Sequence, residues 1–135
     1  MGRFLTYLLL AIIALGAGFY FYQRNITPIA VTAADIEKGG SFSADERATL
    51  VNACTGRAKQ DGAKVCGCIA DKAATDLSRF DRLVMTASFQ QKLSDIVAAG
   101  KGLIASGIPA EKIKAAEDGS KIRMKDIMKT CNLPE

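Results

Sequence analysis

The segment ACTGRAKQDGAKVCGC, residues 53–68, determines how the rest of this chain is expected to fold. Asp61-Gly62 marks a turn between two runs that have helical periodicity. The segment also carries three of the four cysteines of the chain, and the fourth lies near the C-terminus: Cys54, Cys66, Cys68 and Cys131. It therefore predicts a short helical hairpin that is cross-linked by disulfides.

Helical periodicity continues through residues 43–135, and no stretch shows the alternation that is typical of a strand. Ser43 and Ser78 each precede an acidic residue by three positions, which is the pattern of a capping box at the start of a helix. The sequence thus predicts an all-α fold, in which this region forms one small disulfide-stapled bundle of four or five short helices.

Expected helix ends follow from glycines and from changes in the apolar stripe. The helix after Ser43 is expected to run to about Gln60, and the next one from Ala63 to about Leu77. A restart is expected near Ser88, where the apolar stripe shifts. Gly100-Lys101-Gly102 is expected to end that helix, and residues 118–120, Asp-Gly-Ser, to interrupt the last one.

An apolar run, FLTYLLLAIIALGAGFYFY, occupies residues 4–22 and contains no charge. As a helix it would rise about 28 Å, close to the ~30 Å hydrocarbon core of a bilayer. Tyr20 and Tyr22 end the run, where aromatic residues favour the membrane interface. The run predicts one N-terminal transmembrane helix that is an uncleaved signal anchor rather than a removed signal peptide.

Three regions follow from this pattern. Residues 1–24 are the expected transmembrane anchor, residues 25–42 a tether that is broken by Pro28 and Gly39-Gly40, and residues 43–135 the helical domain. An even number of cysteines behind an anchor is typical of an oxidising compartment. We therefore expect a single-pass protein of a bacterial inner membrane, with the C-terminal domain in the periplasm.

Two disulfide pairings are compatible with the hairpin. Cys66 and Cys68 point about 200° apart on one helix, so they cannot bond each other. Height along the hairpin favours Cys54–Cys68 together with Cys66–Cys131. The apolar face favours Cys54–Cys66 together with Cys68–Cys131, because Cys66 shares the core stripe that faces Cys54.

Composition excludes several functions. The formal net charge is +4, of which the region from Asp35 onward carries only +2 (16 basic against 14 acidic residues), with the signs interspersed. This pattern lacks the basic face of a nucleic-acid-binding protein. The chain has no histidine, which removes Ser-His and Cys-His catalytic pairs, His-ligated zinc and c-type haem attachment. No catalytic, cofactor-binding or metal site is predicted.

Two alternatives concern the thiols. Cys66-Gly67-Cys68 near a helix start suggests thiol–disulfide exchange, because the helix dipole lowers a thiol pKa. The familiar C-x-x-C motif in a βαβ context is absent. Three or four thiolates could also hold a metal, but paired C-x-x-C knuckles are missing and oxidation competes for the thiols.

The positions Cys54, Cys66, Cys68, Leu77-Ser78 and Cys131 resemble the C…CxC…C pattern of small exported or membrane-anchored proteobacterial helical proteins. That resemblance implies a disulfide-bonded helical fold and an extracytoplasmic compartment, and no activity. We expect an interaction or accessory module with an unidentified protein partner. Ala14 and Gly18 form a small-xxx-small pair, which also suggests an accessory subunit of an inner-membrane complex.

Overall fold

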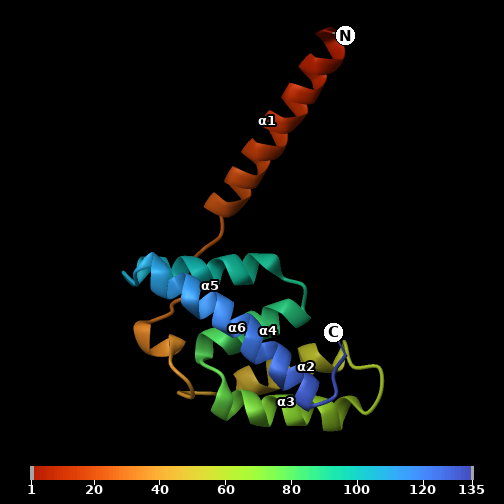
Figure 1. The fold of residues 1–135 in the computed structure, drawn as a ribbon, viewed down its shortest axis with the longest axis vertical. Helices are drawn as coiled ribbons and strands as arrows, with labels where there is room; N and C mark the ends of the chain where they lie inside the picture. Colours follow the sequence, from red (N-terminus) through yellow and green to blue (C-terminus); the bar gives the residue numbers. More distant parts are fainter. Residues whose placement is uncertain (1, 135) are drawn as a thin grey trace.

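The computed structural model describes residues 2–134, apart from the side chains of residues 2–9, 21 and 23. The regular elements in this part of the chain are helical and follow one another as shown in Figure 1. They are α1 (Gly2–Arg24), the 3₁₀ helix η1 (Ala33–Ile36), α2 (Ala44–Thr55), α3 (Gly62–Asp76), α4 (Arg79–Phe89), α5 (Leu93–Ala105) and α6 (Ala110–Thr130). The all-α prediction is confirmed, and residues 43–135 contain five of these helices.

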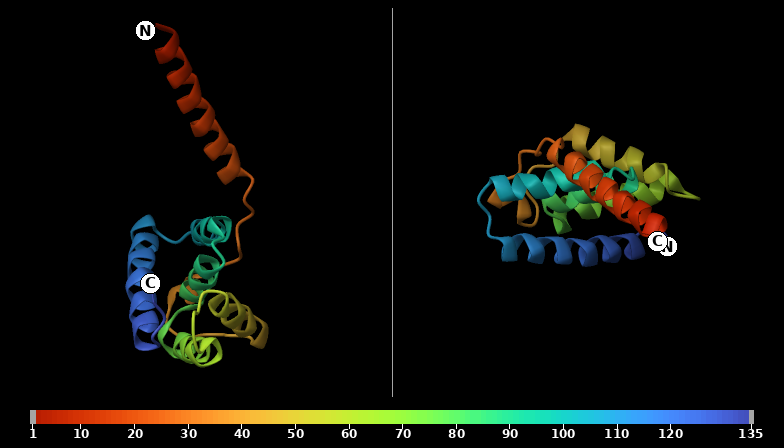
Figure 2. Two further views of the ribbon diagram at one scale, coloured as in Figure 1. Left: turned by 90° about the vertical axis from the view of Figure 1, so that its right-hand side faces the viewer. Right: turned by 90° about the horizontal axis from the view of Figure 1, so that it is seen from above.

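Helix α1 projects away from the other helices in the views of Figures 1 and 2. Its described side chains are exposed on all sides, including Leu10, Ile13, Leu15 and Phe19. Among the described residues, no helix combines the length and the apolar character that crossing a membrane requires.

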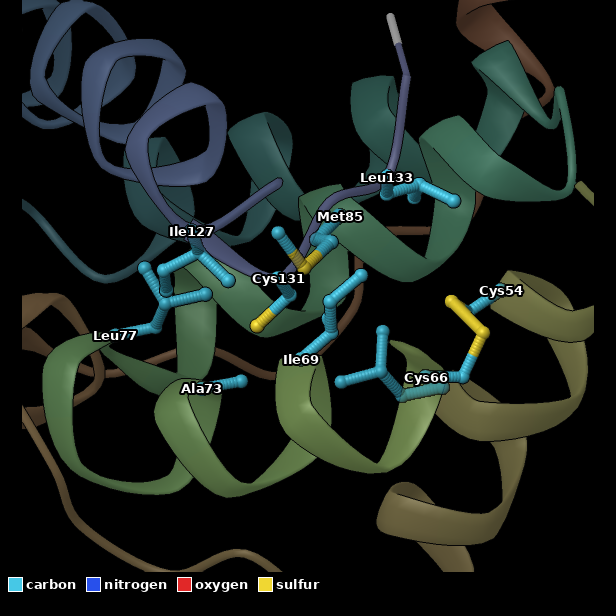
Figure 3. Packing of buried hydrophobic residues seen from close by; sticks show 10 residues of the cluster. Cys54, Cys66, Ile69, Ala73, Leu77, Met85, Ile127, Cys131 and Leu133 are labelled. Atoms are coloured by element: carbon cyan, nitrogen blue, oxygen red, sulfur yellow. A yellow bond between two sulfur atoms is a disulfide. The ribbon is translucent and has the colours of Figure 1, made fainter. Parts of the chain in front are cut away.

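Helix α4 lies between two clusters of buried side chains. It contacts α2, α5, α6 and η1. Phe80 belongs to the cluster formed with α5 and the start of α6, whereas Met85 belongs to the cluster around the cysteines (Figure 3). The shifted apolar stripe in the sequence therefore has a second cause besides the expected restart: α4 presents a different face to each cluster. The restart itself is confirmed, because α4 ends at Phe89 and α5 begins at Leu93.

Capping differs between the two predicted boxes. At Ser78 the box is complete, since its hydroxyl accepts from the Asp81 amide at 3.0 Å and the Asp81 carboxylate accepts from the Ser78 amide at 3.2 Å. At Ser43 only half of the box forms. The Ser43 hydroxyl accepts from the Glu46 amide at 3.1 Å, but the Glu46 carboxylate lies 3.9 Å from the Arg79 guanidinium instead.

The α2–α3 loop is longer than the sequence predicted. Helix α2 ends at Thr55 rather than near Gln60, and Gly56 is its C-cap. Asp61, with a φ of 50°, adopts the left-handed conformation directly before α3. The turn therefore occupies residues 56–61 rather than being centred on Asp61-Gly62.

Gly102 does not end a helix, so that prediction was wrong. Helix α5 continues to Ala105, and Gly107, with a φ of 76°, follows its end. The glycine is needed for a close approach instead. A Cβ atom at residue 102 would lie 1.9 Å from the backbone oxygen of Ile29 and 3.1 Å from the Val31 side chain.

Helix α6 also continues through Asp118-Gly119-Ser120, where an interruption was predicted. Gly119 lies beneath the Arg123 side chain, since a Cβ atom there would be 2.6 Å from the Arg123 guanidinium. Ser120 is buried and faces the core. Arg123 of the same helix thus covers Gly119, and the bundle covers Ser120.

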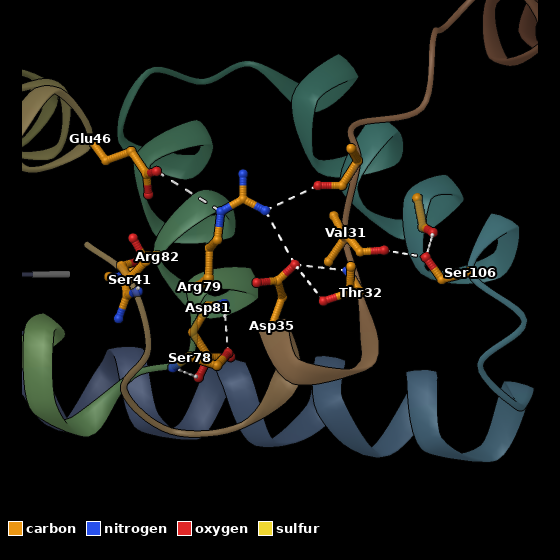
Figure 4. A network of polar contacts seen from close by, with 12 residues as sticks. Val31, Thr32, Asp35, Ser41, Glu46, Ser78, Arg79, Asp81, Arg82 and Ser106 are labelled. Atoms are coloured by element: carbon orange, nitrogen blue, oxygen red, sulfur yellow. Dashed lines mark hydrogen bonds and ion pairs between the residues drawn. The ribbon is translucent and has the colours of Figure 1, made fainter. Parts of the chain in front are cut away.

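Residues 25–42, predicted as a tether, lie against the bundle over much of their length (Figure 4). The Ile29 amide donates to the Ala98 carbonyl at 3.1 Å, and the Ser106 hydroxyl donates to the Val31 carbonyl. Val31 is buried in the cluster with Phe80 and Leu103. An isolated β-bridge also joins Lys38 to Ser78. We refer to residues 29–41 as the strap.

Candidate functional site

The four cysteines form two disulfides, Cys54–Cys66 and Cys68–Cys131, with Cα separations of 5.7 Å and 5.8 Å. The pairing favoured by height, Cys54–Cys68 with Cys66–Cys131, was wrong, and the pairing favoured by the apolar face is present. Figure 3 shows the Cys54–Cys66 bond between α2 and α3.

The length of the α2–α3 loop explains why the heights of the cysteines along the hairpin favoured the wrong pairing. Cys54 lies one residue before the end of α2, whereas Cys66 and Cys68 lie four and six residues after the start of α3. At ~1.5 Å per residue, Cys66 is then nearer in height to Cys54 than Cys68 is, by about 3 Å. Cys66 also faces the core, where its exposed fraction is 0%.

This geometry bears on thiol chemistry. Cys66 and Cys68 have separate partners on separate helices, and the described residues contain no free cysteine. Cys54, Cys66 and Cys131 are buried, so an attacking thiolate has little access to their sulfurs. Cys66 and Cys68 therefore do not form with each other the reversible disulfide that thiol–disulfide exchange at this motif would use. Within residues 2–134 as described, no cluster of three or more metal-ligating side chains occurs either.

A buried polar network joins the strap to α4. The Arg82 guanidinium donates to the carbonyls of Gly39, Leu77 and Ser41 at 3.2, 3.0 and 2.7 Å, and it lies 4.6 Å from the centroid of the Phe42 ring. Burial lowers the pKa of Arg82 from its ordinary value, and the nearby carboxylate of Glu46 opposes that shift. These hydrogen bonds hold the backbone of the strap against Leu77 and α4, and they leave the guanidinium turned toward the interior rather than toward a ligand.

The same network reaches α6. The Asp81 carboxylate accepts from the Arg123 guanidinium at 2.8 Å and 3.0 Å, a bidentate arrangement, while it also caps α4 at Ser78. The Asp81 side chain is only 1% exposed and that of Arg123 is 32% exposed. Asp81 is thus satisfied on both oxygens. We assign the network a structural role, because the buried Asp81 carboxylate is paired with Arg123 and the buried Arg82 guanidinium is bonded to backbone carbonyls of the fold.

A groove of about 400 Å³ opens between α4, α6 and the segment after α6. Met85 and Leu133, both buried, form its floor, while Phe89, Met124 and Met128 are half-buried and form its walls. These side chains come from distant parts of the sequence and meet because α4 and α6 pack together around Met85.

The rim of the groove is basic. Arg57, Lys121 and Lys125 line it and are exposed. The Arg57 guanidinium donates to the Ser88 carbonyl at 3.4 Å, which holds its charge at the groove edge. No acidic residue lines the groove within the described part of the chain. A concave apolar site with a few convergent polar groups is the usual form of a ligand-binding site.

Sequence reasoning did not find this groove. Its apolar residues are ordinary members of helical stripes, and nothing local distinguishes Met124 or Met128 from core positions. The nearest available signal was the accumulation of methionine, which is over-used at adaptable binding surfaces.

Comparison with known proteins gives no assignment. No family model, no curated protein and no solved structure matches this chain. The disulfides and the groove therefore have to be interpreted from their own chemistry.

Proposed function

We propose that this chain is a membrane-anchored accessory module, whose disulfide-stapled helical domain lies in the periplasm and binds another molecule through the groove. The observation that carries the proposal is the groove itself, with its buried apolar floor, its methionine walls and a basic rim in which the described residues include no acidic one. The proposal assigns the protein a binding role and no catalytic step.

The anchor part of the proposal rests on α1. The uncharged run begins at Phe4, so part of it lies among residues 4–9, whose side chains fall outside the described part. At 100° per residue, the exposed apolar side chains of residues 10–20 and 22 are distributed all round the helix axis. A helix that is apolar on all sides favours insertion, whereas a helix lying on a membrane surface needs one polar face.

The compartment part rests on the disulfides. Two disulfides in a domain of this size are typical of an oxidising compartment and uncommon in the cytosol. An anchor at residues 1–24 would hold the domain near the membrane surface, and the strap would fix the distance, because it packs on α5 directly after a short linker. In this arrangement, the groove is accessible to molecules at or near the membrane surface.

The topology is tested in cells that express the full chain. Alkaline carbonate washing should leave the chain in the membrane fraction, and protease added to spheroplasts should remove the domain. A soluble product that begins near Ala17 would contradict the anchor.

Binding at the groove is tested by photo-crosslinking in the same cells. A photo-reactive residue in place of Met128, on the groove wall, should give an adduct of defined mass. The same residue in place of Asp126, which is exposed on another face of α6, is the matched control and should give none. Equal labelling at both positions, or at neither, would overturn the binding role.

A further inference from the structure

The composition of the groove narrows the choice of its ligand. Three of the four methionines in the chain, Met85, Met124 and Met128, line it. Methionine side chains are unbranched, flexible and polarizable, so they adapt to apolar partners of variable shape. Such walls suit a flexible alkyl chain better than a rigid polar molecule.

The size of the groove favours a small ligand over a protein. Its volume of about 400 Å³ falls within the ~300–1,000 Å³ range of small-molecule sites. Ten residues line it, whereas a stable protein–protein interface uses roughly 20–30 residues on each side. The buried floor, which includes Met85 with an exposed fraction of 1%, also makes the site concave rather than flat.

The charges indicate which end of the ligand lies at the opening. Lys121 and Lys125 are one turn apart on α6 and face the same side, and Arg57 lies on the same rim. Lys121 makes no ion pair with another described residue. Like charges in this arrangement repel each other, so an anionic group placed between them lowers the free energy of the bound state.

We infer that the groove binds a single-chain amphiphile with an anionic head group. The alkyl chain lies among the methionines, above Leu133, and the head group is held by Lys121, Lys125 and Arg57. A free fatty acid and a lysophospholipid share this chemistry. The inference rests on the proposed function only in taking the groove as the binding site.

Methionine-methyl NMR of the full chain in phosphatidylcholine nanodiscs tests the inference. The probes are tetradecanoate, myristoyl lysophosphatidylglycerol and, as a cationic control, tetradecyltrimethylammonium, each titrated below its critical micelle concentration and against empty nanodiscs. Both anionic probes should shift the Met124 and Met128 signals saturably. The anionic probe that binds with the higher affinity identifies the source of the ligand as a free fatty acid or a lysophospholipid.

Charge-reversed variants supply the matched comparison. Lys121→Glu/Lys125→Glu should weaken binding of the anionic probes roughly tenfold, since each reversal replaces an exposed attraction with a repulsion of similar size. Lys112→Glu/Lys114→Glu makes the same charge change at exposed positions of α6 that do not line the groove, and it should change affinity less than about twofold. The dispersion of the methionine signals reports whether each variant is folded.

Three results of these titrations would overturn the inference. They are the absence of a saturable shift with either anionic probe, equal binding of the cationic probe, and equal loss of affinity in the two charge-reversed pairs. If the photo-crosslinked adduct at residue 128 is instead a polypeptide, the groove still binds a partner, and only the choice of an amphiphile fails.

Discussion

Replacing Gly102 with Ala should destabilise the protein, although the substitution favours helix formation. In an exposed helix interior the change from Gly to Ala stabilises by about 1 kcal/mol. Here the added methyl group would lie 1.9 Å from the Ile29 carbonyl oxygen, and backbone cannot yield as a flexible side chain can. The strap must therefore move away from α5.

The magnitude follows from what that movement breaks. Loss of the bond from the Ile29 amide to the Ala98 carbonyl costs about 1 kcal/mol, and partial exposure of Val31, now 2% exposed, costs up to about 2 kcal/mol. After the gain in helix propensity is subtracted, the net loss of unfolding free energy is up to about 2 kcal/mol. Urea unfolding followed by circular dichroism measures it, and hydrogen exchange at the Ile29 amide should accelerate.

Gly100→Ala is the matched control, two residues earlier on the same helix. Its Cβ atom would lie 3.8 Å from the Glu117 carboxylate, which is ordinary van der Waals contact. This variant should be as stable as the parent or up to about 1 kcal/mol more stable. The reasoning is refuted if Gly102→Ala is as stable as Gly100→Ala and the Ile29 amide remains protected.

Three further substitutions test the framework around the groove. Cys131→Ser should lower the unfolding free energy by about 4 kcal/mol, because it opens a loop with a sequence separation of 63, and Cys68 alone should then become open to alkylation in the folded protein; a second reactive thiol would contradict the pairing. Ser78→Ala should cost about 1–2 kcal/mol and Ser43→Ala about 0.5–1 kcal/mol in thermal unfolding, since only Ser78 is buried in a complete capping box, so equal losses would count against the assignment. Arg82→Lys should cost about 2–3 kcal/mol, because one ammonium group cannot reach carbonyls on both the strap and Leu77, the C-cap of α3, and a neutral result in urea unfolding would show that the guanidinium fork is dispensable.

Local sequence signals were sufficient where the physics is local. Ser78 and Asp81 lie three residues apart, and the hydrogen bonds that they exchange depend on almost nothing else. The helical periodicity of residues 43–135 likewise predicted the class of fold and the number of helices. Each of these features is determined within one or two helical turns.

Features that depend on distant contacts were missed. Gly102 is a residue type that often ends a helix. Here its lack of a side chain instead lets the strap, some 70 residues earlier in the chain, pack directly on α5. The disulfide pairing depended on the length of the loop at residues 56–61, which a helical wheel does not include. The groove required α4 and α6 to meet, so Met85 and Met128 could not be associated from their positions in the sequence.

The pairing of Cys68 with Cys131 has a consequence for the order of biosynthesis. Helices α2 to α6 are all synthesised before Cys131, so the Cys68 thiol exists without its partner for most of that time. Cys54 and Cys66 can join as soon as their hairpin has formed. A chain truncated before residue 131 therefore keeps one odd thiol, and it is chemically distinguishable from a full-length molecule by its capacity to form mixed disulfides.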